Sequence, residues 1–275
     1  MSELVKNPIT IVLAFDAQNC NPNGDPDNDN NPRQFEDGIG YMSSESIKYK
    51  IRSYIRDKVL FDGLEKNSHA LYCSPDTFSI EHSVKECLEP IIGKKTKGIP
   101  DDQQLEAYKE LCRYYYDTRM FGLVNTSYSN CSLLSRIKGA CQVSMPMSYD
   151  PIEIIPMTIT RCCVASDAER KGEDKGAKKG VSIDESDDGA EKKTKDRMIG
   201  RRSIIRYGLY HMSIQINSAM AQRNGVTMDD VNLLIDALQH MFEEDMPSTG
   251  LICLSVLLRW KTKPSRQLST NCLTA

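Results

Sequence analysis

The sequence predicts an α+β fold in which apolar strands are interleaved with amphipathic helices. β-branched, apolar runs bounded by turn residues occur near both ends, at 9–15 and 251–258, and such runs are typical of buried strands. Helical periodicity preceded by capping residues occurs at 43–60 and 227–242. Strands at both ends with helices between them favour one sheet covered by helices.

The first helix is expected to begin at Ser43 or Ser44, since either hydroxyl can cap it, and to end near Leu60. Its apolar residues recur every four positions: Ile47, Ile51, Ile55 and Val59. Three cations with the same spacing lie beside this stripe: Lys48, Arg52 and Arg56. The helix can therefore bury one face and present a row of positive charge at its margin.

The middle of the chain is predicted to be less regular. Residues 62–100 show no clear period and are expected to form an irregular insertion. Asp101 is expected to cap a helix that ends near Gly122. Extended pieces are expected at 140–147 and 152–164.

Residues 166–197 contain 19 charged side chains among 32, ten acidic and nine basic, and are predicted to form a mobile insertion. A strand is expected at 204–217, and Thr227 to Asp230 forms a capping box at the start of the next helix. Without its insertions the chain reads strand, helix, extended pieces, strand, helix, strand. That is the order of a ferredoxin-like or RNA-recognition-type sheet in a single domain spanning 1–275.

Composition narrows the function classes. A net charge of −3 over 275 residues means that any phosphate-binding surface must be local. No apolar run is long enough to span a bilayer, so no membrane partner is expected and the cytoplasm is the expected location. The ten cysteines include no Cys-x-x-Cys pair and the four histidines form no cluster, which favours buried thiols and argues against a zinc site.

The polar loop at 19–32 has two chemical interpretations. Asp25, Asp27, Asp29 and Glu36 occupy positions 1, 3, 5 and 12 of a calcium-binding loop, although Asn30 replaces the required glycine. This alternative would make the protein a calcium-binding protein or a metal-dependent nuclease.

The other interpretation is contact with an anion or ribose, because Asn and Gly tolerate unusual backbone angles and expose N–H groups. The carboxylates of the loop could instead pair with arginines of a neighbouring subunit. The chain contains no nucleophile motif, phosphate loop or His/Asp cluster. We therefore expect a non-enzymatic protein with no cofactor and no bound metal.

Four motifs occur in a characteristic order: Asn19-x-Asn-Pro-Asn-Gly-Asp-Pro-Asp27, Ser43-Ser-x-x-x-Lys-x-Lys-Ile-Arg52, Tyr116-Asp-x-Arg-x-Phe-Gly122 and Gly200-Arg-Arg-x-x-x-x-Tyr-Gly-Leu-Tyr210. Together they resemble the backbone subunit of type I CRISPR surveillance complexes (Cascade), the Cas-seven family, most closely its type I-C branch. The likeness extends from residue 9 to about residue 245.

This resemblance implies an RNA-recognition-type palm with large finger and thumb insertions, with 166–197 as a possible thumb segment. Copies of such a subunit polymerise along a CRISPR guide RNA and grip its phosphates without reading sequence. The guide then pairs with target DNA in antiviral defence. The implied partners are the guide RNA, target DNA through the guide, other copies of the chain and other Cascade subunits.

The resemblance also assigns roles to individual residues. The guide-phosphate contacts expected on the first helix are Ser43, Ser44, Lys48 and Arg52, with Arg56 continuing the row. The residues expected to shape the adjacent loop are Asn21, Asn23 and Gly24. Weaker candidates are basic residues in the later motifs or beside the charged insertion: Arg119, Arg161, Arg201 and Arg202.

The segment 250–275 departs from the family pattern, which would place an Asn-Ala-Pro-Ala-His-Lys-Leu-Phe-like sequence after the last strand. Reading the back-translated tail one base earlier permits a sequence with that character. We therefore expect a shift of reading frame near residues 246–250, which would make the last strand partly foreign and impair assembly.

Overall fold

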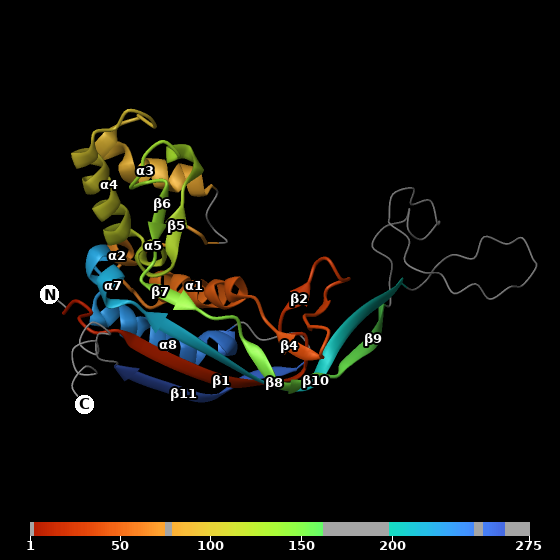
Figure 1. Ribbon diagram of the computed structural model, residues 1–275. Coiled ribbons are helices and arrows are strands. Elements are labelled where there is room, and N and C mark those ends of the chain that lie inside the picture. Colours follow the sequence, from red (N-terminus) through yellow and green to blue (C-terminus); the bar gives the residue numbers. More distant parts are fainter. Residues whose placement is uncertain (1–2, 75–78, 162–197, 245–249, 262–275) are drawn as a thin grey trace, which may run out of the picture.

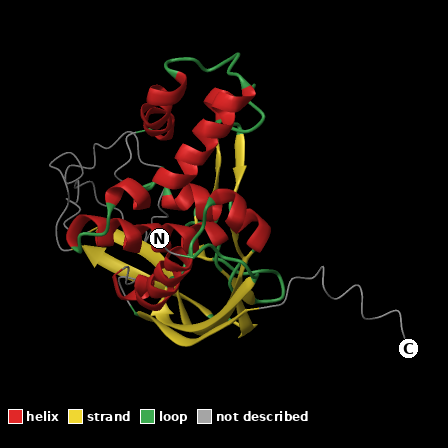
Figure 2. Cartoon of the chain, turned by 90° about the vertical axis from the view of Figure 1, so that its left-hand side faces the viewer, coloured by secondary structure: helices red, strands yellow, loops and turns green. Residues whose placement is uncertain are grey.

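The computed structural model describes residues 3–74, 79–161, 198–244 and 250–261. It has an α+β fold, as the sequence predicts. An antiparallel seven-stranded sheet forms one layer, and helices α1 (Ser44–Phe61) and α8 (Met228–Glu244) pack together against it (Figure 1). Seen from the side, the helices gather on one side of the curved sheet (Figure 2).

Strand β1 (Ile9–Cys20) lies inside the sheet between β10 (Met198–Ile216) and β11 (Leu251–Lys261). Its odd-numbered residues from Ile9 to Ala17 are buried beneath the helices, which is the alternation expected of a half-covered strand. The strand runs five residues beyond the predicted end at Phe15. Pairing with β10 continues to Cys20 opposite Ile205, so the ladder extends into a polar stretch that lacks any strand-like pattern.

Strand β10 joins two parts of the molecule. Its C-terminal half pairs with β1, with β7 (Cys141–Val143) and with β8 (Met147–Pro151). Its N-terminal half pairs with β9 (Ile154–Arg161) to form a two-stranded arm that projects from the sheet (Figure 1). At the far edge, β4 (Ile39–Tyr41) pairs with β8.

The main core lies between the sheet and the two helices. Its fully buried side chains include Leu13, Phe15, Ile51 and Leu234. The apolar stripe predicted on α1 is confirmed for Ile47, Ile51 and Ile55, which are completely buried, whereas Val59 is half-buried. The predicted capping box of α8 is also confirmed: the Thr227 N–H donates to Asp230 Oδ2 at 2.8 Å, and the Asp230 N–H donates to Thr227 Oγ1 at 3.3 Å.

A second core forms a lobe beside the sheet. Its buried residues come mainly from α3 (Ile80–Ile92), α4 (Asp101–Tyr114), β5 (Gly122–Val124), the 3-10 turn Thr126–Tyr128 and β6 (Arg136–Lys138). The short helices α2 (Lys66–His69) and α5 (Tyr116–Phe121) lie at its base. The prediction of an irregular segment at 62–100 is wrong in this respect, because α3 buries Val84, Leu88 and Ile92 at helical spacing. Ser79 caps this helix through a bond from the His82 N–H.

The helix predicted from Asp101 to Gly122 is two helices. Pro100 rather than Asp101 occupies the capping position, and Tyr115 separates α4 from α5 in an extended conformation, with φ −98° and ψ 115°. Helix α5 therefore leaves the axis of α4. Tyr116 and Met120 pack into the main core, whereas Tyr115, the residue before α5, packs into the second. Since α5 also contacts α4, β5 and β6, it joins the two cores.

Within the described residues, Cys20, Cys112, Cys131 and Cys141 are buried free thiols, as the sequence predicts, whereas Cys73 and Cys87 are half-buried and Cys253 is exposed. No helix in the described ranges is long and apolar enough to cross a membrane. Strand β11 pairs with β1 along its length, so 251–261 continues the sheet. The predicted insertion at 166–197 and residues 262–275 lie outside the described residues.

Candidate nucleic-acid interface

The loop after β1 folds into a small hairpin of β2 (Gly24–Asp25) and β3 (Asn31–Pro32). The Asp25 carbonyl accepts N–H bonds from Asn28 at 3.1 Å and Asn30 at 2.8 Å, which close the turn. Asp29 and Asn30 have φ of 47° and 57°, and Asn19 at the end of β1 has φ of 50°. Asn and Asp are the residues besides glycine that adopt this left-handed region most readily, as the second interpretation of the loop expects.

The three loop residues singled out in the sequence fix the shape of the hairpin. Asn21 Nδ2 donates to the Asn30 carbonyl at 2.7 Å. Asn23 Oδ1 accepts the backbone N–H of Ser43 at 2.9 Å, which ties the hairpin to the start of α1. A Cβ on Gly24 would lie 2.0 Å from Asn30 Oδ1, so a larger residue would force the Asn30 side chain to move.

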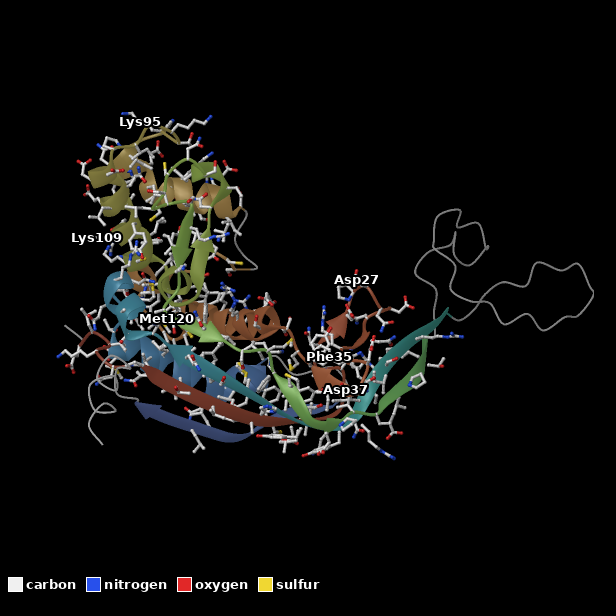
Figure 3. All side chains as sticks on the ribbon, in the orientation of Figure 1. Asp27, Phe35, Asp37, Lys95, Lys109 and Met120 are labelled. Atoms are coloured by element: carbon white, nitrogen blue, oxygen red, sulfur yellow. The ribbon has the colours of Figure 1, made fainter. Side chains whose placement is uncertain are left out.

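The carboxylates of the loop do not converge on a cation site. Asp25 Oδ1 accepts the Asp27 N–H at 3.3 Å and lies 3.5 Å from the Arg33 guanidinium. Asp27 stands at the tip of the hairpin, pointing away from the body of the protein (Figure 3). Within the described residues, no three His, Cys, Asp or Glu side chains are grouped to hold a metal ion. The calcium and metal-nuclease alternative is therefore not supported by this arrangement.

The start of α1 is a polar cluster. Ser43 is the N-cap, and its Oγ accepts the Ser46 N–H at 3.2 Å. Ser44 Oγ donates to Glu45 Oε1 at 2.9 Å, and this bond lowers the pKa of the Glu45 carboxyl. The same carboxylate lies 3.8 Å from Lys48 Nζ. An exposed, ionised glutamate thus shares the helix N-terminus with the two serines.

The predicted row of cations follows α1, but its members differ in environment. The Lys48 side chain is 25% exposed and has only its loose pairing with Glu45 in the described part of the chain. Arg56 Nε donates to Asp57 Oδ1 at 2.8 Å. Arg52 is only 12% exposed, and its Nε donates to Asp117 Oδ2 at 3.0 Å. Lys48 is therefore the cation of this row that is best placed to meet a phosphate.

Asp117 is the most deeply buried acid near this row. Burial raises the pKa of its carboxyl to about 6, while the Arg52 guanidinium and the N–H groups of Tyr72 and Cys73 favour the ionised form. These two N–H groups donate at 3.0 and 3.2 Å. Three donors around one carboxylate satisfy a charge that would otherwise be costly to bury.

Arg119 is not available for RNA, contrary to the expectation from the sequence. Its side chain is 6% exposed and donates to Asp230 Oδ1 from Nη2 at 2.6 Å and from Nε at 3.2 Å. The carbonyl of Cys112 accepts a further bond from Nη1 at 3.3 Å. Arg119 thus holds α5 against the N-terminus of α8 and has no guanidinium edge to offer a guide phosphate.

The remaining arginines lie on the projecting arm. Arg201 and Arg202 belong to β10, opposite Thr158 and Met157 of β9. Arg201 is exposed and Arg202 is half-buried. Arg161 pairs with Met198 at the end of the arm, and its side chain lies outside the described residues.

The structure thus brings the loop residues and the start of α1 together, with the arm next to them. Strand β3 contacts β10, and the hairpin stands between α1 and the β9–β10 arm (Figures 1 and 3). Arg119 is separate from this group. The sequence analysis assigned no role to Glu45 or Asp117. The available signal for Glu45 was its place directly after Ser43 and Ser44, and for Asp117 its place in the motif Tyr116-Asp-x-Arg.

The fold and this surface define an antiparallel α+β protein whose hairpin, helix and arm meet at one end of a sheet. A sequence model of the family described as CRISPR-associated protein Cas7 matches residues 7–270. The chain therefore belongs to the Cas7 family.

A relative from Haloferax volcanii, described as CRISPR-associated protein Cas7, is 27% identical over 157 residues. That alignment covers 54% of this chain, and the chain spans only 42% of the length of the relative.

Two solved structures align with most of this chain at low sequence identity. A chain of a CRISPR RNA-guided surveillance complex, pre-nicking, has a TM-score of 0.49 and 14% identity, covering 98% of this chain and 81% of that chain. A chain of a type III-B Cmr-beta complex bound to cognate target RNA has a TM-score of 0.43 and 12% identity, covering 93% and 61%. Membership of the family rests on the sequence match and not on these scores.

Proposed function

We propose that the protein is a non-catalytic subunit that binds CRISPR guide RNA and assembles with copies of itself along it. The observation that carries the proposal is the family match across residues 7–270. The local clustering of the candidate contacts supports it, because a chain with a net charge of −3 needs a confined surface to bind a polyanion.

The strand order supports a ferredoxin-like palm. Strands β11, β1, β10 and β7 lie side by side, and α1 and α8 form the crossings of a βαββαβ unit. In this proposal the second core and the β9–β10 arm are insertions into the palm, and 166–197 belongs to the thumb. The motif at 19–27 together with the helix that follows it supports the type I-C branch.

The proposed RNA contacts are the residues expected from the family resemblance, without Arg119. The backbone and side chains that shape the groove wall are Asn21, Asn23 and Gly24. The residues that would meet guide phosphates are Ser43, Ser44, Lys48, Arg52, Arg56, Arg161, Arg201 and Arg202. A phosphate at the start of α1 would compete with Glu45 for Ser44 and Lys48, which are both within reach of its carboxylate.

Contacts of this kind position RNA without reading its sequence. Specificity would come from pairing between the exposed guide bases and target DNA. The remaining subunits of the surveillance complex would cap or accompany the filament. Within the same proposal, the exposed Asp27 and Asp29 remain free to pair with a neighbouring copy.

The experiment compares Lys48→Ala with wild type in binding to a labelled oligouridine over a series of salt concentrations. Loss of one phosphate contact should lower affinity for all sequences alike and reduce the log–log salt slope by about 0.7. Lys109→Ala is the matched control, because Lys109 is an exposed lysine on α4, away from the hairpin (Figure 3). An unchanged slope for Lys48→Ala would refute the assignment of this surface.

A further inference from the structure

Asp117 connects three separate parts of the chain although its side chain has no exposed surface. It comes from α5, which joins the two cores. Its Oδ1 accepts the Tyr72 N–H, and its Oδ2 accepts both the Cys73 N–H and Arg52 Nε. The two main-chain N–H bonds therefore hold the carboxylate in one orientation, independently of its bond to the guanidinium.

Two aromatic rings also lie near the Arg52 guanidinium. The guanidinium carbon lies 5.8 Å from the ring centre of Tyr72 and 5.4 Å from that of Phe121. The Tyr72 hydroxyl in turn donates to the Gly122 carbonyl at 3.0 Å, which fixes that ring. With Nε bound to Asp117, the N–H groups of Nη1 and Nη2 are the remaining donors of the guanidinium.

That remaining edge has the geometry that a phosphate uses. Arginine binds phosphate through two parallel N–H groups, and the bond is strongest when the guanidinium is already oriented. The Arg52 side chain retains 12% exposure, so it is not fully sealed from solvent, and it lies on α1 one helical turn after Lys48. The carboxylate of Asp117 and a phosphate would then bind different edges of the same guanidinium.

We propose that Asp117 is a positioning residue, which holds the Arg52 guanidinium so that its outer edge meets a phosphate of the bound RNA. The inference rests on the proposed function and adds to it a residue that never touches the nucleic acid. It assigns the aspartate of the Tyr116-Asp-x-Arg-x-Phe-Gly122 motif a role in recognition, and the arginine of the same motif a role in joining α5 to α8.

Coulomb attraction and positioning predict opposite changes in RNA affinity when Asp117 is replaced. Replacing Asp117 with Asn removes a negative charge near the phosphate site, so simple Coulomb attraction predicts tighter RNA binding. Positioning predicts weaker binding, because a neutral amide holds the guanidinium less firmly than a carboxylate does. The sign of the change therefore separates the two effects.

The experiment measures binding of a labelled oligouridine to wild type, Asp117→Asn and Asp230→Asn at about pH 7.5, where Asp117 is ionised. Asp230→Asn is the matched control, since it alters the other buried arginine–aspartate pair of α5. Circular dichroism defines a temperature at which all three are folded. Asp117→Asn should weaken binding by about tenfold and lower the salt slope, while Asp230→Asn should not.

Arg52→Lys is the second variant, because it keeps the charge but lacks the two-edged guanidinium. This variant should lose affinity to a similar extent. If Asp117→Asn does not fold, the affinity of Arg52→Lys still tests whether the guanidinium contacts the RNA. Binding by Asp117→Asn as tight as wild type, an equal loss in Asp230→Asn, or full affinity in Arg52→Lys would overturn the inference. Failure of the wild-type protein to bind RNA would overturn the proposed function, and this inference with it.

Discussion

Glu45 is predicted to oppose RNA binding, so its replacement by Gln should increase affinity. Its carboxylate accepts the Ser44 hydroxyl at 2.9 Å and lies 3.8 Å from Lys48 Nζ, and thus occupies two of the proposed phosphate contacts. Glu45→Gln removes the charge and keeps the shape of the side chain. The variant also loses a favourable acid in the first turn of α1, which should lower stability by about 0.3–1 kcal/mol.

The size of the effect follows from exposure. The Glu45 side chain is 77% exposed, so its interactions are those of a surface charge and are each worth about 0.2–1 kcal/mol. Affinity for oligouridine should rise by about 1.5- to 5-fold at low salt, and the gain should shrink as salt screens the charge. Fluorescence anisotropy over a salt series measures both quantities.

The matched control is Glu81→Gln, which changes the net charge equally. Glu81 also lies in the first turn of a helix and pairs with a lysine, Lys85, but it belongs to α3 in the second core. Equal gains in the two variants would show that only net charge matters. Weaker binding in Glu45→Gln would refute the placement of a phosphate at the start of α1.

Three further predictions concern stability and the loop. Asp230→Ala leaves the buried Arg119 guanidinium unpaired and should lower the free energy of unfolding by about 3–5 kcal/mol in urea titrations; a loss below about 1 kcal/mol would contradict the burial of this pair. Burial raises the pKa of the Asp117 carboxyl to about 6, compared with about 3.9 in an unfolded chain, so the native state binds more protons than the unfolded state between these values. This residue therefore makes the free energy of unfolding fall as pH rises from about 4 to 6. Asp117→Asn should remove that part of the profile, and parallel profiles for the two proteins would count against it. Gly24→Ala places a Cβ against Asn30, so it should weaken RNA binding while the urea midpoint changes little; unchanged binding would show that the hairpin does not form part of the interface.

Local patterns in the sequence were sufficient for the helices that pack on the sheet. The four-residue repeat of Ile47, Ile51 and Ile55 and the capping box at Thr227 depend on neighbours within one turn, and both are confirmed. The extension of β1 to Cys20 was not predictable in this way. Its polar end is held by pairing with β10, which lies almost two hundred residues later in the chain.

The site shows the same division. Asn21, Asn23 and Gly24 shape the hairpin through contacts within about twenty residues, and the sequence identified them. Arg119 looked like a phosphate ligand because its partner Asp230 lies 111 residues away, in the capping box of another helix.

Arg52 and Asp117 are likewise separated by 65 residues. Spacing in a sequence does not reveal which charges neutralise each other across a fold. The arrangement of the loop also does not support the calcium interpretation. Its spacing fits only if the loop wraps around an ion, whereas the left-handed residues at 29 and 30 close a hairpin that points Asp27 outward.

The expected change of reading frame remains a prediction. Residues 251–261 pair with β1, and the family match extends to residue 270, so the sheet and the family likeness both continue past the proposed point of change. Sequencing the gene in related strains decides the matter. An uninterrupted frame with the same tail in several strains would exclude the shift.

The central claim is that this chain holds CRISPR guide RNA, and the most direct test is to identify the RNA that accompanies it. The protein is purified from its host at low salt, and the bound RNA is extracted and sequenced beside RNA from a Lys48→Ala preparation. The account predicts enrichment of short transcripts containing CRISPR repeat sequence, reduced in the variant. Bound RNA with the composition of the total cellular pool, or no bound RNA, would contradict it.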